Sequence, residues 1–351
     1  MTGKEQVINA LSHVMDPELH QDLVSLKMIE NVVVDGEKVS FSIVLTTPSC
    51  PLKTKIEADA RQAVLTMTDA KEVHINMTSR VQGAKKAVDL GSNRFEHVIA
   101  VGSGKGGVGK STVSVNIALA LAKDGAKVGL LDADIYGPNI PRMLSIDGLP
   151  EPLPGKKIRP AELQGLKIVS IGFLVQNGQP LIWRGPMLHS AIQQFITDFD
   201  WGRLDYLVVD LPPGTGDVQL SLSQTLPIDG AVIVSTPQQV AIDDAYRAVN
   251  MFDKLQIPIY GIVENMAYLP MPDGTKLHVF GENGGEHLAS LVGTRLLGRI
   301  PIDPAIGQGG DIGSPVVMQE PLSDSGQVFM DIARSIAAEA SKMAHNKRKS
   351  G

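Results

Sequence analysis

The chain has 351 residues and a formal net charge of −6, with 43% hydrophobic and 20% charged residues. This composition is typical of a globular protein with two or three domains, and the acidic balance argues against general nucleic-acid binding, which usually needs a basic face. No apolar stretch approaches the roughly 20 residues of a membrane span. A single cysteine excludes an internal disulfide framework. We therefore expect a cytoplasmic protein that binds neither nucleic acid nor a membrane.

The first 80 residues are predicted to form a small α+β domain. Two β-rich runs are joined at Asp35-Gly36, a dipeptide that favours a hairpin because both residues tolerate a positive φ. On either side, apolar residues recur with helical or strand spacing. The expected elements are a helix over residues 5–15, a hairpin over 31–47, a helix over 52–67 and a strand over 71–78. The polar residues 81–94 are expected to link domain 1–80 to the next domain.

From residue 95 onward, apolar β-rich runs alternate with helical stretches. Seven such runs occur: "HVIAVGS", "KVGLLDAD", "KIVSIGF", "DYLVVD", "GAVIVSTP", "IPIYGIVEN" and "TRLLGRIP". Nearly continuous apolar runs that alternate with helices predict an α/β fold, with a parallel sheet covered by helices on both faces. Such sheets bind ligands at the carboxyl ends of their strands. We expect this domain to cover residues 95–345, followed by a basic tail at 346–351.

Residues 104–111 match the pattern G-x-x-x-x-G-K-[ST] of a phosphate-binding loop. The pattern stands between an apolar strand and a helix, which is the structural context it requires. Lys110 would neutralise the β- and γ-phosphates of a nucleotide, Ser111 would offer its hydroxyl to Mg²⁺, and Thr112 could contact the α-phosphate. The expected nucleotide-binding residues of the loop are Gly104, Lys105, Gly106, Gly107, Val108, Gly109, Lys110, Ser111 and Thr112.

Aspartates stand at the ends of two further apolar strands. Asp132 and Asp134 follow one strand in "LLDADIYGPN", and Asp210 ends another in "YLVVDLPPGTGD". An isolated aspartate at such a position often only caps a helix. Because the carboxyl ends of parallel strands meet at one edge of the sheet, the three carboxylates are expected near the phosphates, with Asp210 orienting Mg²⁺.

These motifs together resemble a known family. "GKGGVGKST" resembles the deviant Walker A loop of the ParA, MinD, ArsA-type and nitrogenase iron-protein ATPases. With "DADIYGPN", "DLPPGTGD", "STPQ" and "ENM", residues 95–340 more specifically resemble the Mrp/ApbC family of iron–sulfur cluster carrier ATPases, and "LTTPSCPLK" in the first 80 residues resembles the SufT-like domain often fused ahead of it. The resemblance implies a homodimeric, Mg²⁺-dependent ATP hydrolase that assembles iron–sulfur clusters, or transfers them to apoproteins, together with assembly factors.

The resemblance also implies roles for single residues. Lys105 would reach across the homodimer to the partner's nucleotide, in the manner of an arginine finger. Asp134 would position or polarise the attacking water, so that Lys105, Lys110 and Asp134 form the catalytic set. Asp132 would lie near Mg²⁺ with Asp210 as an outer carboxylate. The further nucleotide contacts implied are Asn265 of "VENM" for the adenine, and Pro301 and Asp303 in a flanking loop.

The sequence departs from the family pattern where a C-x-x-C should follow "ENM". The segment "ENMAYLPMPDGTKLHVFGENGG" has no cysteine, its methionines are poor cluster ligands, and His278 and His287 lack ligand spacing. Cys50 is left as the candidate ligand. Its place at a strand-to-helix turn predicts a lowered pKa and a reactive thiolate, although a small buried packing residue is an equal explanation.

The sequence is also compatible with two other functions. One is a ParA/MinD-like ATPase switch that positions or holds a protein partner without carrying a cluster. The other is a small-molecule kinase, for which no acceptor pocket is evident.

Overall fold

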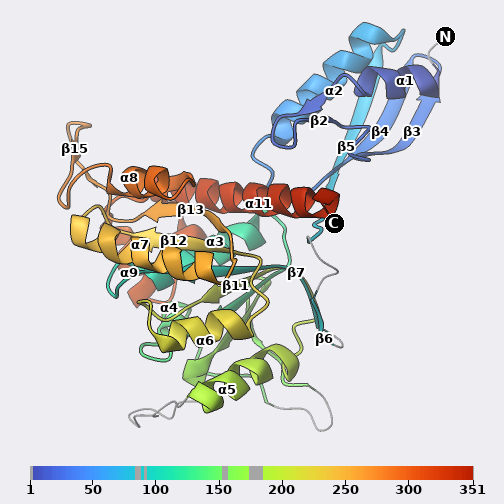
Figure 1. Cartoon of the computed structure of the whole chain (residues 1–351). Coiled ribbons are helices and arrows are strands. Elements are labelled where there is room, and N and C mark those ends of the chain that lie inside the picture. The colour runs from blue at the N-terminus through green and yellow to red at the C-terminus, as the bar shows by residue number, and fades with distance from the viewer. Residues whose placement is uncertain (1–2, 84–87, 91–92, 152–156, 174–184, 351) are drawn as a thin grey trace. The chain divides into compact units, whose positions relative to one another are not determined.

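A computed structural model describes residues 3–83, 88–90, 93–151, 157–173 and 185–350 (Figure 1). The chain divides into two compact units. The first comprises Met1–Ala84 together with Ala337–Gly351, and the second comprises Lys85–Ile336.

The first unit is a small three-stranded sheet with two helices. Its elements are α1 (Lys4–Leu11), β3 (Ile29–Asp35), β4 (Lys38–Leu45), α2 (Lys53–Met67) and β5 (Glu72–Ser79), with the short pair β1 (Met15–Asp16) and β2 (Gln21–Asp22). Strands β3 and β4 are antiparallel around Gly36, whose φ is +60°, and β5 lies parallel to β4. The predicted helix–hairpin–helix–strand order is therefore confirmed.

A separate apolar core holds this unit together. Leu11 of α1, Val64 of α2 and Phe41 of β4 are buried in one cluster. The parallel β4–β5 pair requires a crossover, and α2 provides it while covering one face of the sheet. The unit thus has its own core, as an independently folding domain requires.

The second unit is built on a large, mostly parallel sheet. Its strands, in spatial order, are β16 (Leu296–Arg299), β13 (Ile259–Glu264), β12 (Gly230–Ser235), β7 (Asn93–Gly102), β11 (Arg203–Asp210), β8 (Val128–Asp132), β10 (Leu166–Ser170) and β9 (Ala161–Leu163). The seven runs predicted from the sequence form the seven strands from β16 to β10, and neighbours among them are parallel. The edge strand β9 pairs antiparallel with β10, and the additional strand β6 (Val88–Leu90) pairs antiparallel with β7.

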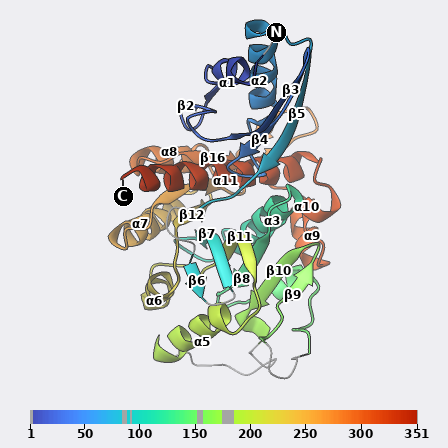
Figure 2. The same ribbon diagram turned by 90° about the vertical axis from the view of Figure 1, so that its right-hand side faces the viewer.

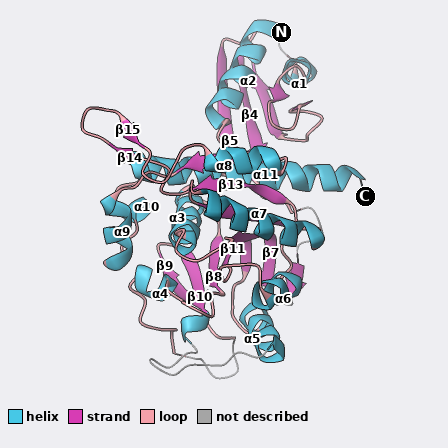
Figure 3. Ribbon diagram, turned by 60° about the vertical axis from the view of Figure 1, so that its left-hand side comes forward, coloured by secondary structure: helices cyan, strands magenta, loops and turns pink. Residues whose placement is uncertain are grey.

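Helices cover both faces of this sheet, as predicted (Figures 2 and 3). The remaining elements are α3 (Lys110–Lys123), α4 (Ile140–Met143), the 3₁₀ turn Ile171–Phe173, α5 (Gly185–Thr197), α6 (Asp217–Thr225), α7 (Gln239–Lys254), α8 (Gly284–Leu291), α9 (Pro304–Asp311), α10 (Val316–Gln319), α11 (Asp324–Ser350) and the hairpin strands β14 (Leu269–Pro270) and β15 (Lys276–Leu277). Helix α3 packs on one face against β8 and β11, whereas α5 to α8 share a buried apolar cluster on the other face. The largest side chain of that cluster is Trp201, followed by Phe95, Phe195, Phe199 and Phe252.

Helix α11 includes the basic residues that end the chain. It runs to Ser350, so residues 346–350 of the predicted basic tail continue the helix, and residue 351 lies outside the described residues. Among the described residues, no helix has both the length and the apolar character needed to cross a membrane.

Candidate functional site

The phosphate-binding loop connects β7 to α3 at the carboxyl edge of the sheet. Gly104 has to be glycine for steric reasons, since a Cβ there would lie 2.1 Å from the backbone carbonyl carbon of Asp244 in α7. Gly109 caps α3 with φ +81°, a left-handed conformation that other residues adopt at a cost. The loop therefore wraps the start of α3 with its backbone close to neighbouring elements.

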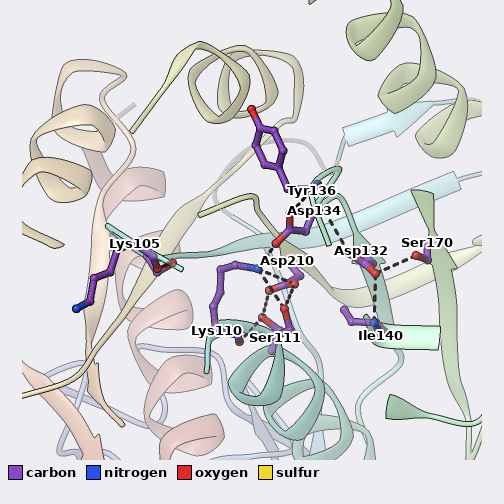
Figure 4. A network of polar contacts seen from close by, with 11 residues as sticks. Lys105, Lys110, Ser111, Asp132, Asp134, Tyr136, Ile140, Ser170 and Asp210 are labelled. Carbon is purple, nitrogen blue, oxygen red and sulfur yellow. Dashed lines mark hydrogen bonds and ion pairs between the residues drawn. The ribbon is translucent and has the colours of Figure 1, made fainter. Parts of the chain in front are cut away.

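Lys110 lies at the centre of a buried polar cluster (Figure 4). Its Nζ donates to Asp210 Oδ2 at 2.8 Å and is 3.3 Å from Asp134 Oδ2. The hydroxyl of Ser111 donates to the same Asp210 oxygen at 2.6 Å, and Ser114 donates to Asp210 Oδ1 at 2.6 Å. Burial disfavours the charged lysine, but the Asp210 and Asp134 carboxylates outweigh this effect and raise the pKa of Lys110. The lysine is therefore held as a cation.

The strand-end aspartates meet as the sequence predicts. Asp210 of β11 and Asp132 of β8 are directly paired in the parallel register. Asp132 is fully buried and accepts hydrogen bonds from Ser170 Oγ at 2.9 Å and from the backbone N–H groups of Asp134 and Ile140. Burial, followed by the nearby charge of Asp210, raises the pKa of Asp132 to about 7.

Asp134 lies between this pair and the opening of the site. Its Oδ1 accepts from the N–H of Tyr136 at 3.1 Å, and its Oδ2 faces Lys110. Burial raises the pKa of Asp134 even though Lys110 acts against the shift. A carboxylate with a raised pKa is a stronger base than an exposed aspartate.

A cavity of about 670 Å³ opens in front of the phosphate-binding loop. Its inner wall is formed by the loop, Ser111, Thr112 and Asp134. The outer wall comes from two segments. Residues 136–143, which begin in the motif "DADIYGPN" and end in α4, contribute Tyr136, Arg142 and Met143, and α9 contributes Ile306, Gly307, Gly310 and Asp311. A volume of this size accommodates a small-molecule ligand.

Lys105 lines the same cavity but is not part of the Lys110 cluster. Its side chain points away from Asp210 and is partly exposed (Figure 4). In the portion of the chain that the structure describes, no carboxylate forms an ion pair with it. Lys105 is therefore a cation available to a ligand or to another chain.

The predicted nucleotide contacts outside the loop occupy other positions. The Asn265 side chain is buried and donates from Nδ2 to the carbonyl of Val108 at 2.8 Å. Asp303 caps α9 by accepting from the N–H of Ala305 at 2.9 Å. None of the three residues Asn265, Pro301 and Asp303 lines the cavity. Helix α9, which Asp303 caps, does contribute Ile306 and Gly307 to the cavity wall.

The oxygen ligands of the site suit a hard cation such as Mg²⁺. Ser111 and Asp210 place a hydroxyl and a carboxylate 2.6 Å apart, whereas Asp132 points to Ser170 and the backbone. Among the described residues, no group of three or more His, Cys, Asp or Glu side chains forms a metal cluster. Mg²⁺ needs only one or two protein oxygens when nucleotide phosphates and water supply the rest, so Ser111 and Asp210 fit it.

Cys50 lies in the first unit, in the turn before α2. The thiol is half-buried, and burial raises its pKa to about 11. The lowered pKa predicted from the helix N-terminus is wrong. A backbone hydrogen bond from Leu52 does act in that direction, but burial dominates and the nearby Glu18 and Asp16 carboxylates add to it.

Two serines of the site, Ser114 and Ser170, were not predicted from the sequence. Ser114 lies one helical turn after Lys110, and that spacing puts both residues on the face of α3 that meets Asp210. Ser170 ends β10, next to β8, and binds Asp132. Helical spacing for Ser114 and strand-end position for Ser170 were the signals that could have identified them.

Comparison with known proteins identifies the families to which this sequence is similar. Residues 94–337 match a family described as NUBPL iron-transfer P-loop NTPase, and residues 4–77 match one described as iron-sulfur cluster assembly protein. The chain is 48% identical over 340 residues to the iron-sulfur cluster carrier protein of Deinococcus radiodurans, covering 96% of this chain and 95% of that protein. It is 50% identical over 242 residues to the iron-sulfur cluster transfer protein NUBPL of Mus musculus, covering 68% of this chain and 76% of that protein.

Solved structures share the fold of the second unit. A nucleotide-binding protein from Archaeoglobus fulgidus in complex with ADP matches with a TM-score of 0.59 and 36% identity, covering 70% of this chain and 95% of that one. The cell division ATPase MinD of Pyrococcus furiosus matches with a TM-score of 0.52 and 23% identity, covering 68% of this chain and 98% of that one. The second match concerns the fold alone.

Proposed function

Because this chain belongs to the NUBPL iron-transfer P-loop NTPase family, we propose that it binds and hydrolyses ATP and carries iron–sulfur clusters to apo acceptor proteins. The observation that carries the ATPase part is the buried Lys110–Asp210–Asp134 cluster at the base of a cavity lined by the phosphate-binding loop. The cluster-carrier part is supported by the match of residues 4–77 to an iron-sulfur cluster assembly family and by the whole-chain relatives.

In the proposed reaction, Lys110 neutralises the β- and γ-phosphates and Asp134 orients the attacking water. The raised pKa of Asp134 suits it to accept a proton, and its carboxylate lies on the cavity wall next to Lys110. Charge then develops on the transferred phosphoryl group and has to be stabilised by cations. Lys110 supplies one of these cations from within the chain.

Ser111 is proposed as the direct protein ligand of Mg²⁺, and Asp210 as the carboxylate that holds Ser111 and orients the metal's waters. When bound there, Mg²⁺ would supply positive charge that offsets the charge of the phosphates. Ser114 keeps Asp210 in place through its second oxygen. Asp132 is proposed to act through the backbone, because it accepts from the Asp134 N–H and so fixes the position of that residue.

Lys105 is proposed to act in a homodimer, on the nucleotide of the partner subunit. This role is supported by its position on the cavity wall, its orientation away from Lys110 and its lack of a carboxylate partner among the described residues (Figure 4). A cation that enters from a second chain would couple hydrolysis to dimer formation, as an arginine finger does. We place this reaction in the cytoplasm, since a chain with one cysteine suits a reducing compartment.

Cys50 is the proposed protein ligand of the cluster cargo. It is the only thiol of the chain, and clusters are held mainly by thiolates. Its raised pKa makes the thiolate scarce until iron binds, because the metal has to displace the proton. Two chains provide two thiolates, so the remaining ligands would come from a small thiol or from the acceptor protein.

Two measurements test the proposal separately. Calorimetry with ATP or ADP and Mg²⁺ should detect binding to the full chain, and no uptake of either nucleotide would refute the ATPase part. Anaerobic reconstitution with iron, sulfide and glutathione should give visible cluster absorption for the wild type, with transfer to an apo-ferredoxin, and little absorption for Cys50→Ala. If the wild type binds nucleotide but no cluster, the ParA/MinD-like switch becomes the better description.

A further inference from the structure

Asn265 contacts the phosphate-binding loop in a way that its predicted adenine-binding role does not explain. Its Nδ2 donates to the carbonyl oxygen of Val108 at 2.8 Å in a buried hydrogen bond that joins residues 157 positions apart in the chain. The residue is only 7% exposed and does not line the cavity. The amide is thus engaged with the backbone of the loop.

The position of Asn265 is fixed by the sheet. It follows the last residue of β13, and its backbone N–H donates to the carbonyl of Ser235 at the end of β12 at 2.8 Å. Its neighbour Met266 has φ +53°, so the chain leaves the strand by a sharp turn. The N–H of Ala267 then donates to the carbonyl of Ile300 at 2.9 Å. The side chain therefore extends toward the loop from a backbone that is held on both sides.

Gly109 leaves room for this contact. A Cβ on Gly109 would lie 2.2 Å from Asn265 Nδ2, which is closer than any real contact. The glycine thus allows the left-handed cap of α3 and the approach of the asparagine amide at the same time. This close fit indicates that the Asn265 amide helps to hold the phosphate-binding loop in its conformation.

The hydrogen bond sets the orientation of one peptide group. Peptide bonds of the described residues are trans, and in a trans peptide the C=O and the following N–H point in opposite directions. Because Asn265 holds the Val108 carbonyl, the Gly109 N–H has to point away from Asn265. Gly109 and Lys110 line the cavity, so this N–H is directed to the side where a phosphate would bind.

We infer that Asn265 is a positioning residue that holds the Val108–Gly109 peptide with its N–H directed at the nucleotide's phosphates, and that it acts independently of the base. Without the clamp, the Val108–Gly109 peptide can rotate, since glycine tolerates both orientations. The phosphate would then lose a fixed donor for any nucleotide. The inference rests on the proposed nucleotide binding.

The test compares ligands with and without a base on the full chain. Isothermal calorimetry with ADP, GDP and pyrophosphate, each with Mg²⁺, is performed on the wild type, Asn265→Asp and Asn265→Ala. Asn265→Asp keeps the shape and removes the donor, whereas Asn265→Ala removes the donor without adding charge. Asn283→Asp serves as the matched control, because Asn283 accepts from Arg299 at 3.2 Å and does not line the cavity.

We expect Asn265→Ala to bind all three ligands more weakly by the same factor, about tenfold for one lost buried hydrogen bond. Asn265→Asp should bind them more weakly still, because its carboxylate also repels the Val108 carbonyl and the phosphates. The preference for ADP over GDP should stay within about twofold of the wild-type value. A loss confined to ADP would show that Asn265 reads the adenine, and unchanged binding of pyrophosphate would equally refute the clamp. If the wild type binds none of the ligands, the proposed function fails instead.

A spectroscopic readout separates the clamp from a general loss of stability. Labelling with ¹³C′-valine and ¹⁵N-glycine selects the amides of Val-Gly pairs, and the sequence has only four, ending at Gly102, Gly109, Gly129 and Gly293. Asn265→Asp should shift the Gly109 amide signal and leave those of Gly129 and Gly293 in place. A Gly109 signal that does not move, or a shift of all four signals, would contradict the inference.

Discussion

Replacing Asp132 by asparagine is expected to remove one pH-dependent contribution to the stability of the second unit. The buried carboxyl has a pKa of about 7, against an ordinary value of 3.8. Between these two values the folded state holds a proton that the unfolded chain has released. The free energy of unfolding therefore falls as the pH rises from about 4 to 7, by up to about 1.4 kcal/mol per pH unit. Over the whole interval the upper bound is about 4 kcal/mol.

Asparagine resembles the protonated form of Asp132 but cannot titrate. It would also turn an N–H₂ toward one of three donors, the Ser170 hydroxyl and the N–H groups of Asp134 and Ile140. A lost hydrogen bond of this kind costs about 1–3 kcal/mol. The variant should therefore be less stable than the wild type at pH 4 and more stable at pH 8. The two stability curves should cross between these values.

The assay is urea unfolding without nucleotide and with EDTA, followed by tryptophan fluorescence. Trp201 is fully buried in the second unit and so reports its unfolding. Asp273→Asn is the control, because hydrogen bonds from Thr275 lower the pKa of exposed Asp273 and place its titration below the measured range. Parallel curves for the wild type and Asp132→Asn would refute the raised pKa and the carboxylate crowding that causes it.

Three further predictions concern the proposed catalytic and ligand residues. Lys110→Ala should abolish nucleotide binding, whereas Asp134→Ala should bind ATP by calorimetry and release no phosphate; normal turnover in Asp134→Ala would remove its assignment. Lys105→Ala should slow hydrolysis and weaken ATP-dependent dimerisation in light scattering, and it has no role in trans if both are unchanged. Cys50, with a pKa of about 11, should react with iodoacetamide at pH 8 about 100-fold more slowly than an ordinary thiol with a pKa near 9. An alkylation rate that levels off below pH 9 would contradict that value.

The sheet and the aspartates at its strand ends were predictable because local signals determine them. A run such as "DYLVVD" is apolar enough to be buried on both faces, which only a parallel sheet with helices on both sides allows. Once the strands are parallel, their carboxyl ends meet at one edge. At that edge the structure pairs Asp210 with Asp132.

Other features depend on contacts between distant segments and could not be predicted from local patterns. The walls that α4 and α9 contribute to the cavity come from helices whose sequences carry no ligand-binding motif. The predicted pKa shift of Cys50 was wrong for a related reason. A helix N-terminus is visible in the sequence, whereas the burial that outweighs it depends on how α2 packs against its domain.

The hydrogen bonds of Asp210 imply that nucleotide binding exchanges contacts in addition to forming new ones. Lys110 and Ser111 both donate to Asp210 Oδ2, and these are the two groups assigned to phosphate and to Mg²⁺. A buried carboxylate that lost both donors would be costly unless a metal's waters replaced them. Ser114 bonds the other oxygen and is assigned to neither ligand, so it can hold Asp210 in place while the partners on Oδ2 change. Binding of the phosphates without Mg²⁺ should therefore be disfavoured, because it would remove Lys110 from Asp210 and supply nothing in its place.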